Sequence, residues 1–141
     1  MNRIWMPRQR AIRHLLALLA SMLLVANACA EPIKVLLHVD QADQAVTLIN
    51  VVDEITKANP AADVQVVVHG AAVTRLRRDD YLSADFERIL ALGVDIGVCN
   101  VSMVRRGQLH SSLLSGVELL TEGSIARILA LQKQGYSYIK I

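Results

Sequence analysis

The sequence has few cysteines and few aromatic residues. Its 141 residues include 2 cysteines, 1 tryptophan, 1 phenylalanine and 3 tyrosines. A small disulfide-rich fold needs several cysteine pairs, so this class is excluded. Because aromatic rings are needed to stack on unpaired bases, a single-stranded nucleic-acid site is disfavoured as well.

Several motifs that mark common enzyme classes are also missing. The chain has neither glycine-rich phosphate-binding signature, G-x-G-x-x-G or G-x-x-x-x-G-K-S/T, and it lacks G-x-S-x-G and H-E-x-x-H. Its histidines and cysteines show no H-x-H or C-x-x-C spacing, so the sequence does not support a zinc or copper site. We therefore expect no nucleotide, no metal and no cofactor.

Long hydrophobic runs are absent except near the N-terminus. Four arginines precede an apolar run at residues 15–25, and Ala28-Cys29-Ala30 follows it. This order is typical of a secretory signal peptide, and the run is too short to span a bilayer comfortably. We predict a signal peptide over residues 1–30, a single mature domain over 31–141 without a stable membrane span, and a periplasmic location. A retained anchor and a lipoprotein modified at Cys29 are the alternatives.

The basic charge of the chain belongs to this N-terminal segment. The whole sequence carries 15 basic and 13 acidic residues, whereas residues 31–141 carry 11 and 13, so the formal net charge changes from +2 to −2. An acidic domain lacks the electrostatic attraction that nucleic-acid binding requires. We expect no nucleic-acid partner.

Strand-like and helix-like segments alternate along the remaining chain. Apolar runs predict strands at residues 33–39, 64–69, 95–99, 116–120 and 136–140. Helical spacing predicts one helix that ends at Asn59-Pro60 and a second that is capped by Ser83 and ends at Gly93. It also predicts a short helix after Cys99 and a last helix that begins near Thr121 or Ser124. Apolar strands joined by helices predict a three-layer α/β/α sandwich around a five-stranded, mainly parallel sheet.

Chemically active side chains follow the first three predicted strands. His38 and Asp40 lie at the end of the first, His69 follows the second and Cys99 ends the third. In open α/β sheets the ligand site lies at the carboxyl ends of the strands, so we expect these groups at one edge of the sheet. Arg105 and Arg106 could add positive charge there, which would favour a thiolate.

Five segments in this order resemble the DsrE/DsrF-like family of sulfur-relay proteins. They are Lys34–Val39, Val66–Gly70, Gly93-Val94, Cys99–Met103 and Gly135–Ile139. The resemblance implies a flavodoxin-like variant with five parallel strands, and homo-oligomers. It also implies that the cysteine at the position of Cys99 carries sulfur as a persulfide.

The resemblance gives Cys99 its expected role, and the residues around it supply our hypotheses for the others. Cys99 is the expected sulfur carrier, His69 or Arg105 stabilises its thiolate, and His38, Asn100 and Ser102 are further pocket candidates. A lone thiol suits a carrier, since a second cysteine nearby would discharge the persulfide as a disulfide. The expected partners are a sulfur donor or acceptor protein. The alternatives are a structural, buried Cys99 and a non-catalytic oligomeric module that binds a small ligand or a protein.

Two further segments bear on partners. The leucines Leu109, Leu113 and Leu114 predict an apolar cluster that an oligomer would bury. The mixed charges of residues 75–80 indicate a solvated loop, with an anion-binding or docking role as the alternative.

Overall fold

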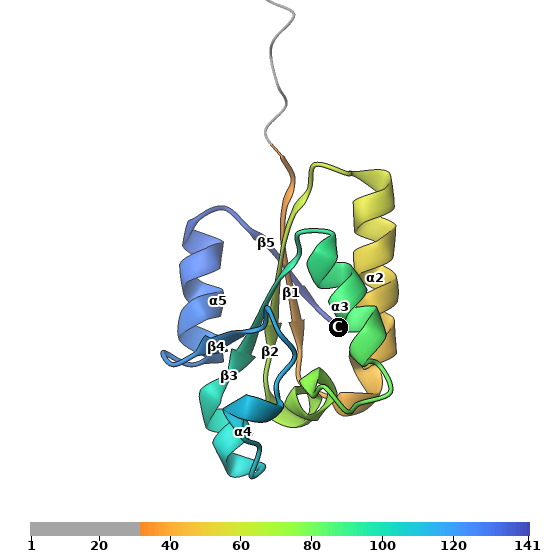
Figure 1. Ribbon diagram of the computed structural model, residues 1–141. Coiled ribbons are helices and arrows are strands. Elements are labelled where there is room, and N and C mark those ends of the chain that lie inside the picture. Colours follow the sequence, from red (N-terminus) through yellow and green to blue (C-terminus); the bar gives the residue numbers. More distant parts are fainter. Residues whose placement is uncertain (1–31) are drawn as a thin grey trace, which may run out of the picture. The chain divides into compact units, whose positions relative to one another are not determined.

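The structure, a computed structural model, describes residues 32–141. The expected signal peptide and Cys29 lie outside the described residues. A five-stranded sheet runs through the domain (Figure 1), with strands β1 (Lys34–Val39), β2 (Asp63–Val68), β3 (Asp95–Cys99), β4 (Glu118–Leu120) and β5 (Ser137–Lys140). The strand order is β4-β3-β2-β1-β5, and every neighbouring pair is parallel. The predicted α/β class with a parallel sheet is confirmed.

Helices cover both faces of this sheet (Figure 1). Helices α2 (Ala45–Ala58) and α3 (Ser83–Ala91) lie on one face, here called the α2/α3 face, and α5 (Ser124–Lys133) lies on the other, the α5 face. The short helix α4 (Asn100–Arg105) follows β3 directly, and 3-10 helices occupy Ala42–Gln44, Gly70–Leu76 and His110–Ser112. Among the described residues, no helix combines the length and the apolar character needed to cross a membrane.

Alternate residues of each strand supply two separate cores, because successive side chains of a strand point to opposite faces. On the α2/α3 face, Leu37 and Val66 pack in one cluster with Phe86 of α3. On the α5 face, Leu36 and Val67 form a smaller cluster, completed by Leu120, Ile128, Leu131 and Tyr136. The sheet therefore has one extensively apolar face and one with a small apolar patch.

The strand order changes direction beside β1. From β1 the chain moves outward through β2, β3 and β4, and α5 then carries it back so that β5 pairs with the other side of β1. Ligand sites of open α/β sheets occur at the carboxyl edge near such a switch in order. His38 of β1 and Lys140 of β5 face each other in register at this point.

The starts of two helices differ from the expectation. Ser83 is the first residue of α3, and its side chain accepts no capping hydrogen bond, since the capping position belongs to Leu82. The turn before α3 is instead held by Asp80, whose carboxylate accepts the backbone N–H of Leu82 at 3.0 Å. Helix α5 begins after Gly123, so neither Thr121 nor Ser124 caps it. The end of α3 is as predicted, with Gly93 at φ +86°.

The predicted leucine cluster is wrong for two of its three members. Leu113 and Leu114 are buried in the core of the α2/α3 face, and only Leu109 is exposed. The backbone N–H of Leu114 donates to the carbonyl of Leu76 at 3.0 Å, which fixes this loop against the 3-10 helix. The sequence pattern missed this because the 3-10 helix over Gly70–Leu76 was not expected.

Candidate functional site

Three of the predicted site residues lie on the α5 face of neighbouring strands. His38 is two residues beyond Leu36, and His69 is two residues beyond Val67, so both side chains point to the same face as these core residues. Cys99 has the same orientation, because Ile96 and Val98 pack on the opposite face. The expected gathering at one edge of the sheet is thus present, and the rings of His38 and His69 stack with centroids 4.6 Å apart.

Cys99 ends β3 and occupies the capping position of α4. It is the only cysteine in the described part of the chain, it is free, and 5% of its surface is exposed. Two residues earlier on the same face, a Cβ on Gly97 would lie 2.8 Å from a methyl carbon of Leu120. The absence of a side chain at Gly97 therefore lets Leu120 pack against β3 beside the cysteine.

Two serines lower the pKa of this thiol. Burial raises the pKa of the Cys99 thiol, but hydrogen bonds from the backbone and side chains of Ser102 and Ser124 outweigh this effect. The net result is a pKa below the ordinary value of a cysteine. Within residues 32–141, no cation contributes to this shift, so hydrogen bonds favour the thiolate here.

Ser102 also connects the thiol to the loop after β2. Its Oγ accepts the backbone N–H of Gly70 at 3.0 Å. Gly70 has φ +59°, and a Cβ there would lie 2.6 Å from the carbonyl oxygen of Asp40. Only glycine fits this close approach. The hydrogen bond from the Gly70 N–H then holds the Ser102 hydroxyl beside the sulfur.

The two stacked histidines are uncharged near neutral pH. Burial, His69 and Lys140 lower the pKa of His38 to about 4, and Asp40 acts in the opposite direction. Burial also lowers the pKa of His69, with Asp40 again opposing and Lys140 contributing. Since neutral imidazoles bear no charge, His69 does not hold a thiolate by Coulomb attraction.

Hydrogen bonds fix the orientation of the histidine pair. His38 is buried, and its Nδ1 shares a hydrogen bond of 2.7 Å with the hydroxyl of Tyr138 on β5. Asp40 forms an ion pair with Lys140 and lies 4.0 Å from Nε2 of His69. Within residues 32–141, the Nε2 atoms of both histidines are buried without a hydrogen-bond partner.

The remaining candidates, Asn100 and Arg105, do not contribute to the pKa shift of Cys99. Oδ1 of Asn100 is 3.1 Å from Nε2 of His110, so its side chain is engaged with the loop after α4. Arg105 is exposed and lines a pocket of about 360 Å³ with Gly70, Ser102 and Arg106. Ser102 thus belongs both to the surroundings of the thiol and to this pocket. The described residues contain no group of three side chains suited to a metal ion.

Sequence reasoning did not identify Ser124 as a site residue. It was expected only as a helix cap, yet it is buried at the start of α5 and hydrogen-bonds to Cys99. The signal was its place after the fourth strand, because β4 pairs with β3 and Leu120 lies in register with Cys99. That pairing could not be deduced without the strand order.

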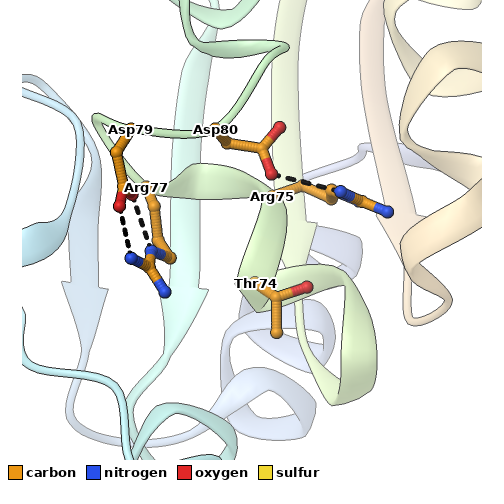
Figure 2. Close-up of a pocket in the computed structure, with 5 residues that line it drawn as sticks. All are labelled: Thr74, Arg75, Arg77, Asp79 and Asp80. Carbon is orange, nitrogen blue, oxygen red and sulfur yellow. Dashed lines mark hydrogen bonds and ion pairs between the residues drawn. The ribbon is translucent and has the colours of Figure 1, made fainter.

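The charged segment at residues 75–80 forms its own ion pairs (Figure 2). Arg75 pairs with Asp80 at 3.2 Å, and Arg77 donates to both carboxylate oxygens of Asp79 at 2.8 and 2.5 Å. These residues and Thr74 line a second pocket of about 360 Å³. Because each arginine there has a carboxylate partner, the geometry favours the solvated-loop interpretation over an anion site.

Comparison with known proteins agrees with this architecture. Residues 17–141 match the sequence profile of the DsrE/DsrF-like family. The chain is similar to the solved structure of MTH1491, a protein of unknown function from Methanobacterium thermoautotrophicum, with 25% identity and a TM-score of 0.73 over 77% of this chain and 99% of that one. It also resembles the ychN protein from E. coli, with 14% identity and a TM-score of 0.65 over 77% of this chain and 100% of that one. No curated protein shows significant sequence similarity to it.

Proposed function

The chain belongs to the DsrE/DsrF-like family, and on that premise we propose that it carries sulfane sulfur as a persulfide on Cys99. The observation that supports this most is the pair of serine hydroxyls on a nearly buried thiol, which keeps its pKa below the ordinary value despite burial. A thiolate is the form that accepts sulfane sulfur, so a lowered pKa raises the reactive fraction at neutral pH. A structural cysteine in an apolar core would show the opposite shift.

The other residues of the site have supporting roles in this proposal. His69 directly follows β2, the strand next to that of Cys99, and in this proposal its neutral ring accepts the thiol proton when the thiolate forms. Ser102 and Ser124 hydrogen-bond to the anionic sulfur before and after loading. With one cysteine in the described domain, a bound persulfide has no intramolecular thiol to discharge it and persists until an acceptor thiol arrives.

The direct test is mass spectrometry after exposure to a sulfane-sulfur donor. In the Cys29→Ala chain, called here the single-thiol chain, Cys99 is the only thiol. Incubation with hydrogen polysulfide should add the mass of one sulfur to the peptide that contains Cys99, and an added acceptor thiol should remove it. A Cys99→Ser control should gain nothing, and an unmodified Cys99 in the folded single-thiol chain would contradict the proposal.

A second candidate function is a non-catalytic oligomeric binding module. Exposed apolar side chains on α4 and α5 favour it, and they are Val101, Val104, Ile125 and Leu129. These helices also supply Ser102 and Ser124, so an oligomer that buries them would enclose the thiol. Light scattering at tens of micromolar should then show a homo-oligomer, and Val104→Asp should weaken it.

We also propose that the protein acts in the periplasm after removal of residues 1–30. This rests on the order of arginines, apolar run and small residues at the N-terminus. The N-terminal sequence of the protein purified from the producing cells should begin at Glu31. An intact Met1 or a lipid on Cys29 would contradict it.

A further inference from the structure

A polar pocket adjoins the Cys99 site through one shared side chain. Gly70, Ser102, Arg105 and Arg106 line this pocket, whose volume is about 360 Å³. Ser102 hydrogen-bonds to Cys99, and its Oγ accepts the N–H of Gly70. A molecule in the pocket would therefore lie one side chain away from the sulfur.

The positive charges in this pocket have no carboxylate partner among residues 32–141. Arg106 donates from Nε to the carbonyl of Gly70 at 2.9 Å, and its terminal nitrogens form no ion pair within the described domain. Arg105 forms neither a hydrogen bond nor an ion pair with any described residue. The residues that line the pocket include no acid.

The pocket at residues 74–80 provides an internal comparison. It has the same volume of about 360 Å³ and also contains two arginines, but Asp79 and Asp80 pair with both of them. The pocket beside Cys99 thus concentrates uncompensated positive charge on a domain whose own formal charge is −2 over residues 31–141. Such a site attracts a small anion.

The chemistry of this site indicates which anion. Guanidinium groups offer planar N–H donors that match the oxygens of sulfonate and phosphate groups. Next to a thiolate that accepts sulfane sulfur, the matching ligand carries both an oxyanion head and a transferable sulfur. We infer that the Arg105–Arg106 pocket binds the sulfonate head of thiosulfate and presents its outer sulfur to Cys99.

The transfer step balances without any other reactant. The Cys99 thiolate attacks the outer sulfur of thiosulfate, a new S–S bond forms, and the S–S bond of thiosulfate breaks. Its electron pair leaves with sulfite, so a thiolate and a thiosulfate dianion become a persulfide anion and a sulfite dianion. This donor assignment rests on the proposed function for the transfer, whereas binding of the oxyanion does not depend on it.

Thiosulfate binding is measured first, in a chain that has no thiol to accept sulfur. Calorimetry on the full chain with Cys29→Ala and Cys99→Ser should show thiosulfate binding that sulfate displaces and that weakens as salt rises. Adding Arg105→Gln should reduce the affinity roughly tenfold, because one charged donor pair is lost. Arg105→Lys should recover part of it, and the matched control Arg77→Gln in the other pocket should leave it unchanged. No binding, or equal loss with Arg77→Gln, would overturn the inference.

Sulfur loading of Cys99 then tests the donor assignment separately from the carrier function. In the single-thiol chain, thiosulfate should load Cys99, and Arg105→Gln should slow this loading roughly tenfold while changing loading from hydrogen polysulfide by less than about twofold. Polysulfide carries no sulfonate head and so makes no use of the pocket. If polysulfide loads Cys99 but thiosulfate does not, the donor assignment fails and the carrier function stands. If neither loads, the carrier function fails, and the calorimetry alone decides whether the pocket binds oxyanions.

Discussion

The two faces of the sheet differ in what their side chains do. The α2/α3 face buries aliphatic side chains from β1, β2 and β3, together with Phe86, Ile89 and the loop residues Leu113 and Leu114. The α5 face has six buried apolar residues, and its carboxyl edge carries Cys99, His38 and His69 instead. One helix covers this face, so polar and reactive groups can lie at its edge while the opposite face supplies most of the apolar burial. Stability and chemistry should therefore respond to different substitutions.

The largest effect on stability should come from Phe86. It is 1% exposed in the core of the α2/α3 face, so Phe86→Ala removes a ring and leaves a cavity. We expect a loss of about 3–5 kcal/mol in the free energy of unfolding. Urea denaturation monitored by circular dichroism would measure it. A loss below about 1 kcal/mol would show that this face does not dominate stability.

The next effect concerns pH and the histidine pair. The pKa of His38 is about 4 in the folded protein against 6.5 unfolded, so the neutral form is favoured by folding. The contribution is complete above pH 6.5 and is lost as the pH falls from 6.5 towards 4, by on the order of 3 kcal/mol for this group. The groups that face the ring are His69, Asp40, Lys140 and Tyr138.

Comparison with His38→Gln isolates this contribution. The variant should lose less stability than the wild type between pH 7 and pH 4.5, because the carboxylates that titrate in this range are common to both proteins. Urea denaturation at the two pH values would measure the difference. Equal slopes would mean that His38 titrates normally in the folded state.

A smaller effect is expected from Ser102→Ala. The change removes the acceptor for the Gly70 N–H and one donor to Cys99, and should cost about 1 kcal/mol of stability. It should also raise the pKa of the Cys99 thiol, measured by the pH dependence of alkylation. Thr74→Ala, in the pocket away from the thiol, is a matched control that should leave this pKa unchanged. An unaltered thiol pKa in Ser102→Ala would remove the serine from the site.

The smallest effect on stability should come from Cys99→Ser. Ser102 and Ser124, which hydrogen-bond to the Cys99 thiol, can also bond to the new hydroxyl, so burial leaves no polar group unpaired. We expect a loss below about 1 kcal/mol, or a shift in melting temperature below roughly 4 °C, with complete loss of sulfur loading. A large drop in the melting temperature would instead indicate a structural cysteine.

Periodicity and chain order were sufficient to predict the architecture of the described domain. Continuous apolar runs such as Val66–Val68 indicate strands buried on both faces, and helical spacing between them requires parallel crossovers. The 3-10 helix over Gly70–Leu76 was not predicted, because it has no hydrophobic periodicity of its own. Its packing also decided that Leu113 and Leu114 are core residues, which local sequence could not reveal.

The site was only partly predictable for a related reason. Strand ends placed His38, His69 and Cys99 at one edge, because all carboxyl ends of a parallel sheet lie together. The roles of Ser124 and of the Gly70–Ser102 hydrogen bond depend on which strands are neighbours and on backbone distances of a few ångströms. The protonation state of the histidines depends on burial, which sequence position does not specify.

The most direct test of the central claim is the pKa of the Cys99 thiol in the folded single-thiol chain. The rate of alkylation by iodoacetamide, measured from pH 5 to pH 10, reports the thiolate fraction, with the urea-unfolded chain as the reference. We predict an apparent pKa below that of the unfolded chain, whose ordinary value is about 8.5, because the Ser102 and Ser124 hydrogen bonds outweigh burial. An apparent pKa at or above the unfolded value would contradict the account and leave Cys99 as a packing residue.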